Sequence, residues 1–120
     1  MVQVVAVQTR KCITSGTAGA PLVISACDGS AGQQWRLAAD GTIRVGKLCM
    51  DARSDADLAA IDAVTCTGDA TQIFAFDGDD HIVNGTSGKC LDIYDGRDTD
   101  GTPIVLWPCL NHGNQVWYRR

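Results

Sequence analysis

One pattern occurs three times along this chain of 120 residues. The cysteines fall into pairs whose members are 15, 17 and 19 positions apart, and a Gln and an aromatic residue follow each second cysteine by six and eight positions. Self-similarity at a fixed spacing indicates a repeated structural unit. We predict a single domain, 1–120, made of three repeats of about 40 residues with approximate bounds 1–45, 46–84 and 85–120. The markers are Cys12, Cys27, Gln33 and Trp35, then Cys49, Cys66, Gln72 and Phe74, and finally Cys90, Cys109, Gln115 and Trp117.

The residues between these markers favour strands over helices. All 14 acidic residues are Asp and 13 residues are Gly, types that suit turns, and long helix formers are few. The runs VQVVAV (2–7), PLVISAC (21–27) and PIVLW (103–107) are typical of strands. We therefore predict an all-β fold in which the repeated aromatic residues meet as core on a shared axis and each repeated Gln ties strands together.

Six cysteines could form disulfides or bind a metal. No CxxC pair occurs and the only histidines are His81 and His112, so the spacing of zinc ligands is absent. Six cysteines allow fifteen pairings, and the threefold pattern makes pairing within each repeat the simplest. Each such bond would stabilise the chain by about 3 kcal/mol in the chain-entropy model. Three disulfides predict an oxidising, extracellular location, with no metal and no cofactor.

Several classes of function are disfavoured. A net charge of −4 without a basic stripe argues against nucleic-acid binding, and no apolar run is long enough to insert into a membrane. MVQVVAV lacks the features of a signal peptide, so we expect the natural chain to extend upstream of Met1. With no Glu, glycoside hydrolysis would need two Asp, and no GxSxG motif occurs. DGRDTDG resembles a calcium loop, but Gly96 stands at the first ligand position and Trp107 at the closing Glu. We predict a protein that is not an enzyme.

The three cysteine pairs, each followed by a QxW-like motif, resemble the ricin-B-type lectin family, which is also classed among carbohydrate-binding modules. The resemblance covers essentially the whole chain. It implies a β-trefoil with twelve strands, six hairpins and pseudo-threefold symmetry. It also implies shallow sugar-binding pockets, with one possible pocket in each repeat.

The third repeat has the residues that a sugar site needs. An aromatic face covers the C–H face of a sugar ring, and carboxylate and amide groups bind its hydroxyls. Asp92 and Asp95 lie in CLDIYDG, and Trp107 lies two residues before Cys109. The resemblance implies that Asp92 accepts hydroxyl hydrogen bonds and Trp107 stacks on the ring. It further implies that Asn114 binds a hydroxyl while Gln115 mainly holds the aspartate in place.

Two observations weaken this interpretation. A Trp beside a Pro could simply be buried, and Asp92 could be a turn residue. Galactose-binding members of the family often carry a polar residue two positions before the stacking aromatic, where this chain has Val105. The resemblance therefore implies one fewer hydroxyl contact and a lower affinity.

The other two repeats lack parts of this set. The second keeps Asp51 and Gln72, a possible weak second site, but has Val64 and Thr71 where the third has Trp107 and Asn114. The first has none of the three groups, with Thr14, Ser25 and Gly32 at these positions. We therefore predict one binding site.

The resemblance favours terminal galactose as the ligand. Xylan-binding relatives more often carry a His directly after the second cysteine, where this chain has Leu110. The alternatives are a module that binds xylan- or arabinan-type plant or microbial polysaccharide, and a scaffold or protein-interaction domain that binds no sugar. Any of these could be an accessory domain of a larger secreted hydrolase or toxin.

Overall fold

The computed structural model describes residues 1–120 as twelve short strands and four single 3-10 turns. None of its helical turns has the length or the apolar character to span a membrane. The strands are β1 (Val4–Ala6), β2 (Cys12–Thr14), β3 (Val23–Ser25), β4 (Trp35–Leu37), β5 (Ile43–Val45), β6 (Leu48–Ala52), β7 (Ile61–Thr65), β8 (Phe74–Phe76), β9 (Ile82–Asn84), β10 (Cys90–Ile93), β11 (Thr102–Trp107) and β12 (Trp117–Arg119). The 3-10 turns are η1 (Ala31–Gln33), η2 (Ala70–Gln72), η3 (Tyr94–Gly96) and η4 (Gly113–Gln115).

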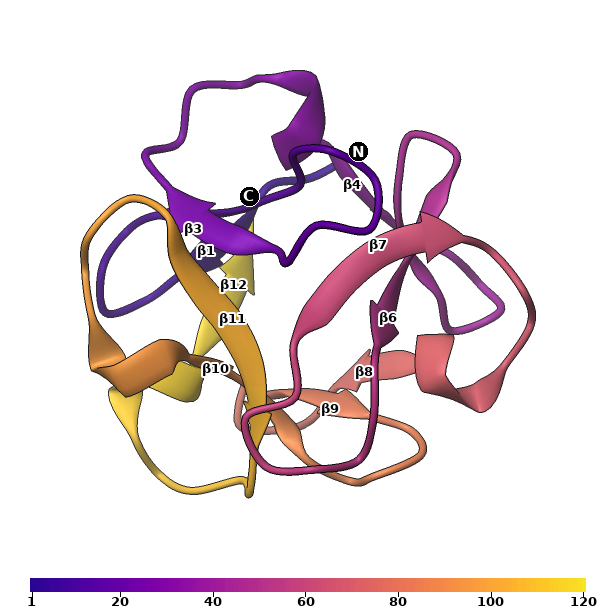
Figure 1. Cartoon of the computed structure of the whole chain (residues 1–120). Helices are drawn as coiled ribbons and strands as arrows, with labels where there is room; N and C mark the ends of the chain where they lie inside the picture. Colours follow the sequence, from indigo (N-terminus) through magenta and orange to yellow (C-terminus); the bar gives the residue numbers. More distant parts are fainter.

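Six of the strands form a closed ring around the core. β4 pairs with β5, β8 with β9, and β12 with β1, all antiparallel. Three equivalent backbone bonds join these pairs: Trp35 N to Val2 O at 2.8 Å, Phe74 N to Gly41 O at 2.9 Å and Trp117 N to Asp80 O at 3.0 Å. The two chain ends therefore lie side by side on β1 and β12 (Figure 1).

The other six strands form three hairpins that pack together over one end of this ring. The hairpins are β2–β3, β6–β7 and β10–β11. β11 pairs with β3 through Thr102 and Pro103, and single bridges join Pro21 to Asp62 and Ala60 to Val105. Three four-strand units around a pseudo-threefold axis make a β-trefoil, visible as three lobes in Figure 1. The predicted all-β, trefoil fold is confirmed.

The three repeated aromatic residues lie in the core where the units meet. Trp35 and Trp117 are fully buried and Phe74 nearly so, within one cluster of 19 buried hydrophobic side chains. Each indole N–H is satisfied, by the carbonyl of Ile13 at 2.9 Å and of Leu91 at 3.2 Å. Phe74 has no side-chain N–H, so the second unit needs no equivalent hydrogen bond.

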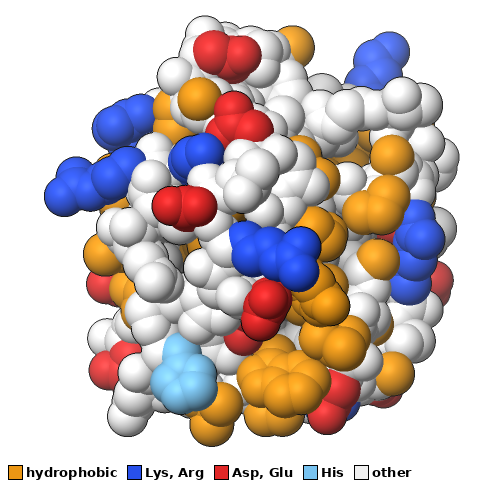
Figure 2. Space-filling model, turned by 60° about the vertical axis from the view of Figure 1, so that its left-hand side comes forward, with side chains coloured by type: hydrophobic (Ala, Val, Ile, Leu, Met, Phe, Trp, Pro, Cys, Tyr) orange, Lys and Arg blue, Asp and Glu red, His pale blue; other side chains and the backbone are white.

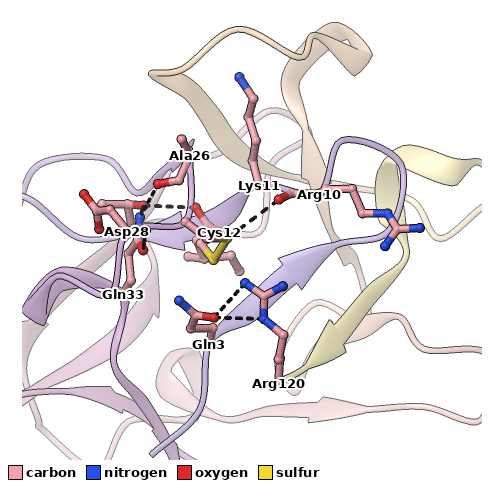
Figure 3. Close-up of a disulfide and its surroundings, with 12 residues drawn as sticks. Gln3, Arg10, Lys11, Cys12, Ala26, Asp28, Gln33 and Arg120 are labelled. Carbon is pink, nitrogen blue, oxygen red and sulfur yellow. Dashed lines mark hydrogen bonds between the residues drawn. A yellow bond between two sulfur atoms is a disulfide. The ribbon is translucent and has the colours of Figure 1, made fainter.

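Each unit contains one disulfide between its second strand and the loop that follows its third. The bonds are Cys12–Cys27, Cys49–Cys66 and Cys90–Cys109, so the pairing predicted within each repeat is confirmed. Figure 3 shows the surroundings of the first disulfide, with the Gln33 amide between Ala26 and Asp28, and Gln3 bonded to Arg120. Each crosslink therefore stabilises one unit, whose individual strands are only three to six residues long.

Candidate functional site

A shallow pocket of about 260 Å³ lies on the outer face of the third unit. Its walls come from β10, η3, β11 and η4, together with the connection between β6 and β7. Figure 2 brings forward the side of the molecule where β10 and β11 lie in Figure 1, and hydrophobic, acidic and histidine side chains gather at the lower edge of that face. The lining residues are Leu58, Asp92, Tyr94, Asp95, Gly96, Val105, Trp107, His112 and Asn114.

The pairing of β10 with β11 brings Asp92 and Trp107 onto one face. Cys90 lies opposite Trp107, and Asp92 lies opposite Val105. Because side chains alternate between the faces of a strand, these four residues point the same way, and Leu91 and its neighbours point into the core. Asp92 and Trp107 are thus diagonal neighbours across the hairpin. Trp107 is only partly buried, and Asp92 is a strand residue rather than a turn residue.

Two amides hold the Asp92 carboxylate in place from behind. Asn114 Nδ2 donates to Oδ1 at 2.7 Å, and Gln115 Nε2 donates to Oδ2 at 2.8 Å. A carboxylate offers about four acceptor positions, so two remain for groups in the pocket. Gln115 itself is fully buried, with its carbonyl accepting from Leu110 N at 2.8 Å and its amide also donating to Pro108 O at 3.0 Å. Gln115 therefore positions Asp92 and does not line the pocket.

Burial changes the electrostatics of Asp92. The side chain is 6% exposed, and this desolvation raises the pKa of its carboxyl above the ordinary value of 3.8. Hydrogen bonds from Gln115 and Asn114, and the nearby His112, act in the opposite direction without cancelling the rise in pKa. The acceptor at the floor of the pocket is consequently easier to protonate than an exposed Asp.

The remaining walls combine apolar faces with polar groups. Trp107, Tyr94, Val105 and Leu58 offer apolar surface, and His112 can donate or accept hydrogen bonds. Asn114 donates both of its amide hydrogens, to Asp92 Oδ1 at 2.7 Å and to Ile93 O at 3.2 Å, so its Oδ1 is left to accept from a ligand. Asp95 is exposed at the rim with a positive φ of 55°, and its carboxylate lies 3.4 Å from Arg97 Nε. This arrangement can cover one face of a small polyhydroxylated ring while its hydroxyls reach Asp92 and Asn114.

The second unit has the same frame, meaning the hydrogen bonds of the repeated Gln to the Asp and to the loop after the third strand. It lacks the aromatic and amide side chains that line the pocket of the third unit. Gln72 Nε2 donates to Asp51 Oδ2 at 2.8 Å and to Thr65 O at 3.0 Å, and its carbonyl accepts from Thr67 N at 2.9 Å. Gln72 is fully buried and fully engaged, so of the two residues in this possible weak site only Asp51 could contact a ligand. The positions of the third unit's Trp and Asn hold Val64 and Thr71.

In the first unit the repeated Gln holds a hydroxyl in place of a carboxylate. Gln33 Nε2 donates to Thr14 Oγ1 at 3.1 Å and to Ala26 O at 2.9 Å, and its carbonyl accepts from Asp28 N at 2.9 Å. In all three units, then, the repeated Gln joins the loop after the third strand to the residue two beyond the first cysteine. The bonds of this Gln belong to the fold as much as to any site.

Sequence reasoning did not assign four residues of the pocket to the site: Leu58, Tyr94, Gly96 and His112. Tyr94 stands two positions after Asp92, and the alternation of a strand could have placed it on the same face. His112 enters the sequence argument only as one of two histidines that lack the spacing of zinc ligands. Leu58 belongs to the second unit and reaches the pocket because its N–H bonds to Leu106 O at 2.8 Å. No local pattern in the sequence indicates that contact.

One acidic cluster elsewhere has spacing compatible with a metal ion. The ligand atoms of Asp77, Asp79 and His81 lie within 4.8 Å of one another. Desolvation acts to raise the pKa of Asp77, but hydrogen bonds from His81 and Asp79 outweigh it and hold that pKa below its ordinary value. Asp40 plays the same part in the first unit, where it accepts bonds from Thr42 N and Oγ1. We assign the cluster to stabilising a turn.

The comparison with known proteins decides the family. A family model for the ricin-type beta-trefoil lectin domain matches residues 1–117. This chain belongs to that family. Ricin-type domains are non-catalytic modules that bind galactosides or other glycans, and membership supports carbohydrate binding as the general function of this domain.

Two curated relatives are similar to this chain over part of their own length. Serine protease 1 of Rarobacter faecitabidus is 32% identical over 106 residues, which cover 87% of this chain and 20% of that protein. Beta-galactoside-specific lectin 2 of Viscum album is 33% identical over 81 residues, covering 58% of this chain and 13% of that protein. The chain thus spans a fifth or less of the length of these curated relatives.

A solved structure resembles the ricin-type domain over nearly its full length. ThreeFoil, a designed threefold-symmetric protein, has a TM-score of 0.88 and 25% identity, with 98% of this chain and 96% of ThreeFoil covered. The two chains therefore share one trefoil from end to end.

Proposed function

We propose that this domain is a non-catalytic lectin that binds a terminal galactose or galactoside in the pocket of the third unit. One observation carries the proposal: the Asp92 carboxylate, held by Asn114 and Gln115, shares a face with the partly exposed Trp107. The acceptor, the amide and the aromatic face that sugar recognition requires therefore line one pocket.

Galactose is the sugar that this pocket suits best. Its axial 4-hydroxyl leaves a continuous C–H face on one side of the ring, which an aromatic side chain can cover. The relative from Viscum album, which is named as a β-galactoside-specific lectin, supports the same choice. Val105 offers no polar group to a sugar hydroxyl. We therefore expect a dissociation constant in the millimolar to high-micromolar range, which corresponds to a binding free energy of about −4 to −6 kcal/mol.

We further propose that the domain works outside the cell and targets a larger protein to glycans. Three disulfides favour an oxidising compartment. A single weak site gives useful affinity only when other domains or copies bind at the same time. The small share of its relatives that the chain spans agrees with such an accessory role.

The decisive experiment is an NMR titration of isotope-labelled protein with lactose and then with xylobiose. We expect lactose to shift the amides of Asn114 and Gln115 and the indole of Trp107, with a stoichiometry of one. Trp107→Ala should remove these shifts, whereas Val64→Ala, at the matched position of the second unit, should leave them intact. A response to xylobiose alone would change the sugar class. Silence with both sugars at tens of millimolar would favour a scaffold without sugar binding.

A further inference from the structure

A second hollow, of about 700 Å³, lies beside the galactose pocket and shares Gly96 with it. One wall comes from the connection between β1 and β2, and the other from the residues that follow η3. We call it the polar cleft, and its lining residues are Gln8, Thr9, Lys11, Gly96, Arg97 and Asp98. None of these side chains is hydrophobic, in contrast to the neighbouring pocket.

Both walls of the polar cleft are anchored. Lys11 Nζ donates to Asp100 Oδ1 at 2.6 Å, and the same oxygen accepts from Ala26 N at 3.1 Å. An ammonium group has three N–H donors, so Lys11 keeps two for a ligand. On the other wall, the Arg97 guanidinium lies 5.3 Å from the centre of the Tyr94 ring. The side chains of Lys11 and Arg97 are therefore each positioned by a contact that already exists in the free protein.

The first wall also touches the turn that carries Asn114. A Cβ atom placed on Gly113 would lie 3.3 Å from Gln8 Oε1, and Val7 N donates to Val116 O at 3.0 Å. η4 is thus bordered by the galactose pocket on one side and by Gln8 on the other. A ligand that fills the pocket and continues past Gly96 would enter the polar cleft.

The chemistry of the polar cleft suits sugar hydroxyls. Lys11 and Arg97 donate, Asp98 accepts, and Gln8 and Thr9 do both. With Asp100 paired to Lys11, the two positive and two negative charges balance, and Figure 2 shows basic and acidic side chains interspersed over this face. No aromatic or aliphatic face is present for stacking. A neutral ring bound here would be recognised through hydrogen bonds alone.

We propose that the polar cleft binds the neutral sugar residue next to the terminal galactose. The ligand class is then a galactoside of two or more sugar residues, held by the third unit through its end and by the first unit through its next ring. This inference rests on the proposed function, since it needs galactose in the pocket.

The test compares methyl β-galactoside with the disaccharides lactose and melibiose, which carry β- and α-linked galactose. At least one disaccharide should bind about two- to tenfold more tightly than the methyl galactoside, the gain expected from one or two net hydrogen bonds. It should also shift the amides of Gln8, Thr9 and Arg97, which the methyl galactoside leaves in place. Isothermal titration calorimetry gives the affinities and NMR gives the shifts.

Two variants separate the polar cleft from the pocket. Gln8→Ala should remove the gain of the disaccharide and leave methyl β-galactoside binding unchanged, because the Gln8 side chain does not line the galactose pocket. Lys47→Ala changes an exposed residue in the equivalent connection between β5 and β6 and should preserve the gain.

The failure of this inference is distinct from the failure of the proposed function. Equal affinities for all three sugars, with shifts confined to the pocket, would overturn the polar-cleft proposal and leave the galactose site standing. A disaccharide gain that survives Gln8→Ala together with silence at Thr9 and Arg97 would overturn it too. No shift at Asn114 or Gln115 with any of the sugars would overturn both proposals.

Discussion

The second and third units build the same frame and end in different surfaces. In both, an Asp stands two residues after the first cysteine and accepts a 2.8 Å bond from the buried Gln that precedes the core aromatic. Over Asp92, the flanking positions hold Tyr94 and Val105, which line a pocket. Over Asp51, the corresponding positions hold Arg53 and Asp62, which form an ion pair with a 2.6 Å contact.

This difference separates what the fold needs from what a ligand needs. The Asp–Gln bond survives in the second unit although the aromatic face and the Asn do not, because that bond also ties the loop after the third strand to the second strand. An Asp at this position is therefore weak evidence for a site. The residues beside this Asp on the same face of the hairpin are the better indication of a binding site.

The largest expected effect is a loss of stability when a core aromatic residue of the repeat is removed. Trp117→Ala should lower the free energy of unfolding by about 3–5 kcal/mol, because it empties a fully buried volume and frees the Leu91 carbonyl. Trp107→Ala in the same unit should change stability far less, since its ring is partly exposed. Urea unfolding of both variants provides the comparison, and similar losses for the two would contradict the division into core and surface tryptophans.

A matched pair of carboxylates separates the two roles of the aspartate. Asp92→Asn and Asp51→Asn should each weaken the fold slightly. Asp92→Asn places an amide donor opposite one of the two amides that donate to Asp92, whereas Asp51→Asn can keep the Gln72 bond through its oxygen but loses the charge that strengthens it. Only Asp92→Asn should weaken lactose binding, by about 1.5–3 kcal/mol, the value of hydrogen bonds to a charged group. Calorimetric titration of both variants measures this. A loss of affinity in Asp51→Asn would show that the second unit also binds.

Acid should weaken binding before it weakens the fold. Because burial raises the pKa of Asp92 above 3.8, this carboxylate takes up a proton at a higher pH than an ordinary Asp, and lactose affinity falls with it. The effect on stability has the opposite sign. A raised pKa means that the charged form costs stability above the folded-state pKa, and this cost disappears as the pH falls.

Lactose titrations across the acid range, with urea unfolding at each pH, test this expectation. Asp92→Asn serves as the control, because its residual affinity should not follow the same pH dependence. Affinity that holds steady down to the pH of global unfolding would contradict the expectation that protonation of Asp92 weakens lactose binding.

The smallest expected effect is a gain in the second unit. Val64→Trp with Thr71→Asn restores the aromatic face and the amide beside Asp51, so the stoichiometry for lactose should rise from one toward two. The new site should be weaker than the first, because the Arg53–Asp62 pair still occupies the flanking positions. NMR shifts at Asp51 and Thr65 would report it. An unchanged stoichiometry would mean that the introduced Trp and Asn are not sufficient for binding, and that a site also needs residues equivalent to Tyr94 and Val105.

Much of the fold could be predicted from spacing. Cysteines, a Gln and an aromatic residue that recur in register indicated three like units, and the strand runs between them indicated an all-β chain. The candidate site could be predicted in part, since Asp92 and Trp107 each lie two residues inside the pair Cys90 and Cys109, and the resemblance to a lectin family names their roles. These site roles, like the repeat bounds and the single domain, remain predictions that binding and unfolding experiments can test.

What the sequence by itself determined is the periodic frame, because disulfides, buried aromatic residues and the bonds of each Gln depend on positions close along the chain within one repeat. What only the tertiary structure decided are the contacts between repeats. Leu58 reaches the third unit's pocket through Leu106, and Gln8 reaches the turn of Gly113 from more than a hundred positions away. The Gln8 contact depends on the closing of the ring of strands, which brings the chain's beginning against its end, and the Leu58 contact depends on the packing of the β6–β7 hairpin against β11. No local periodicity encodes them.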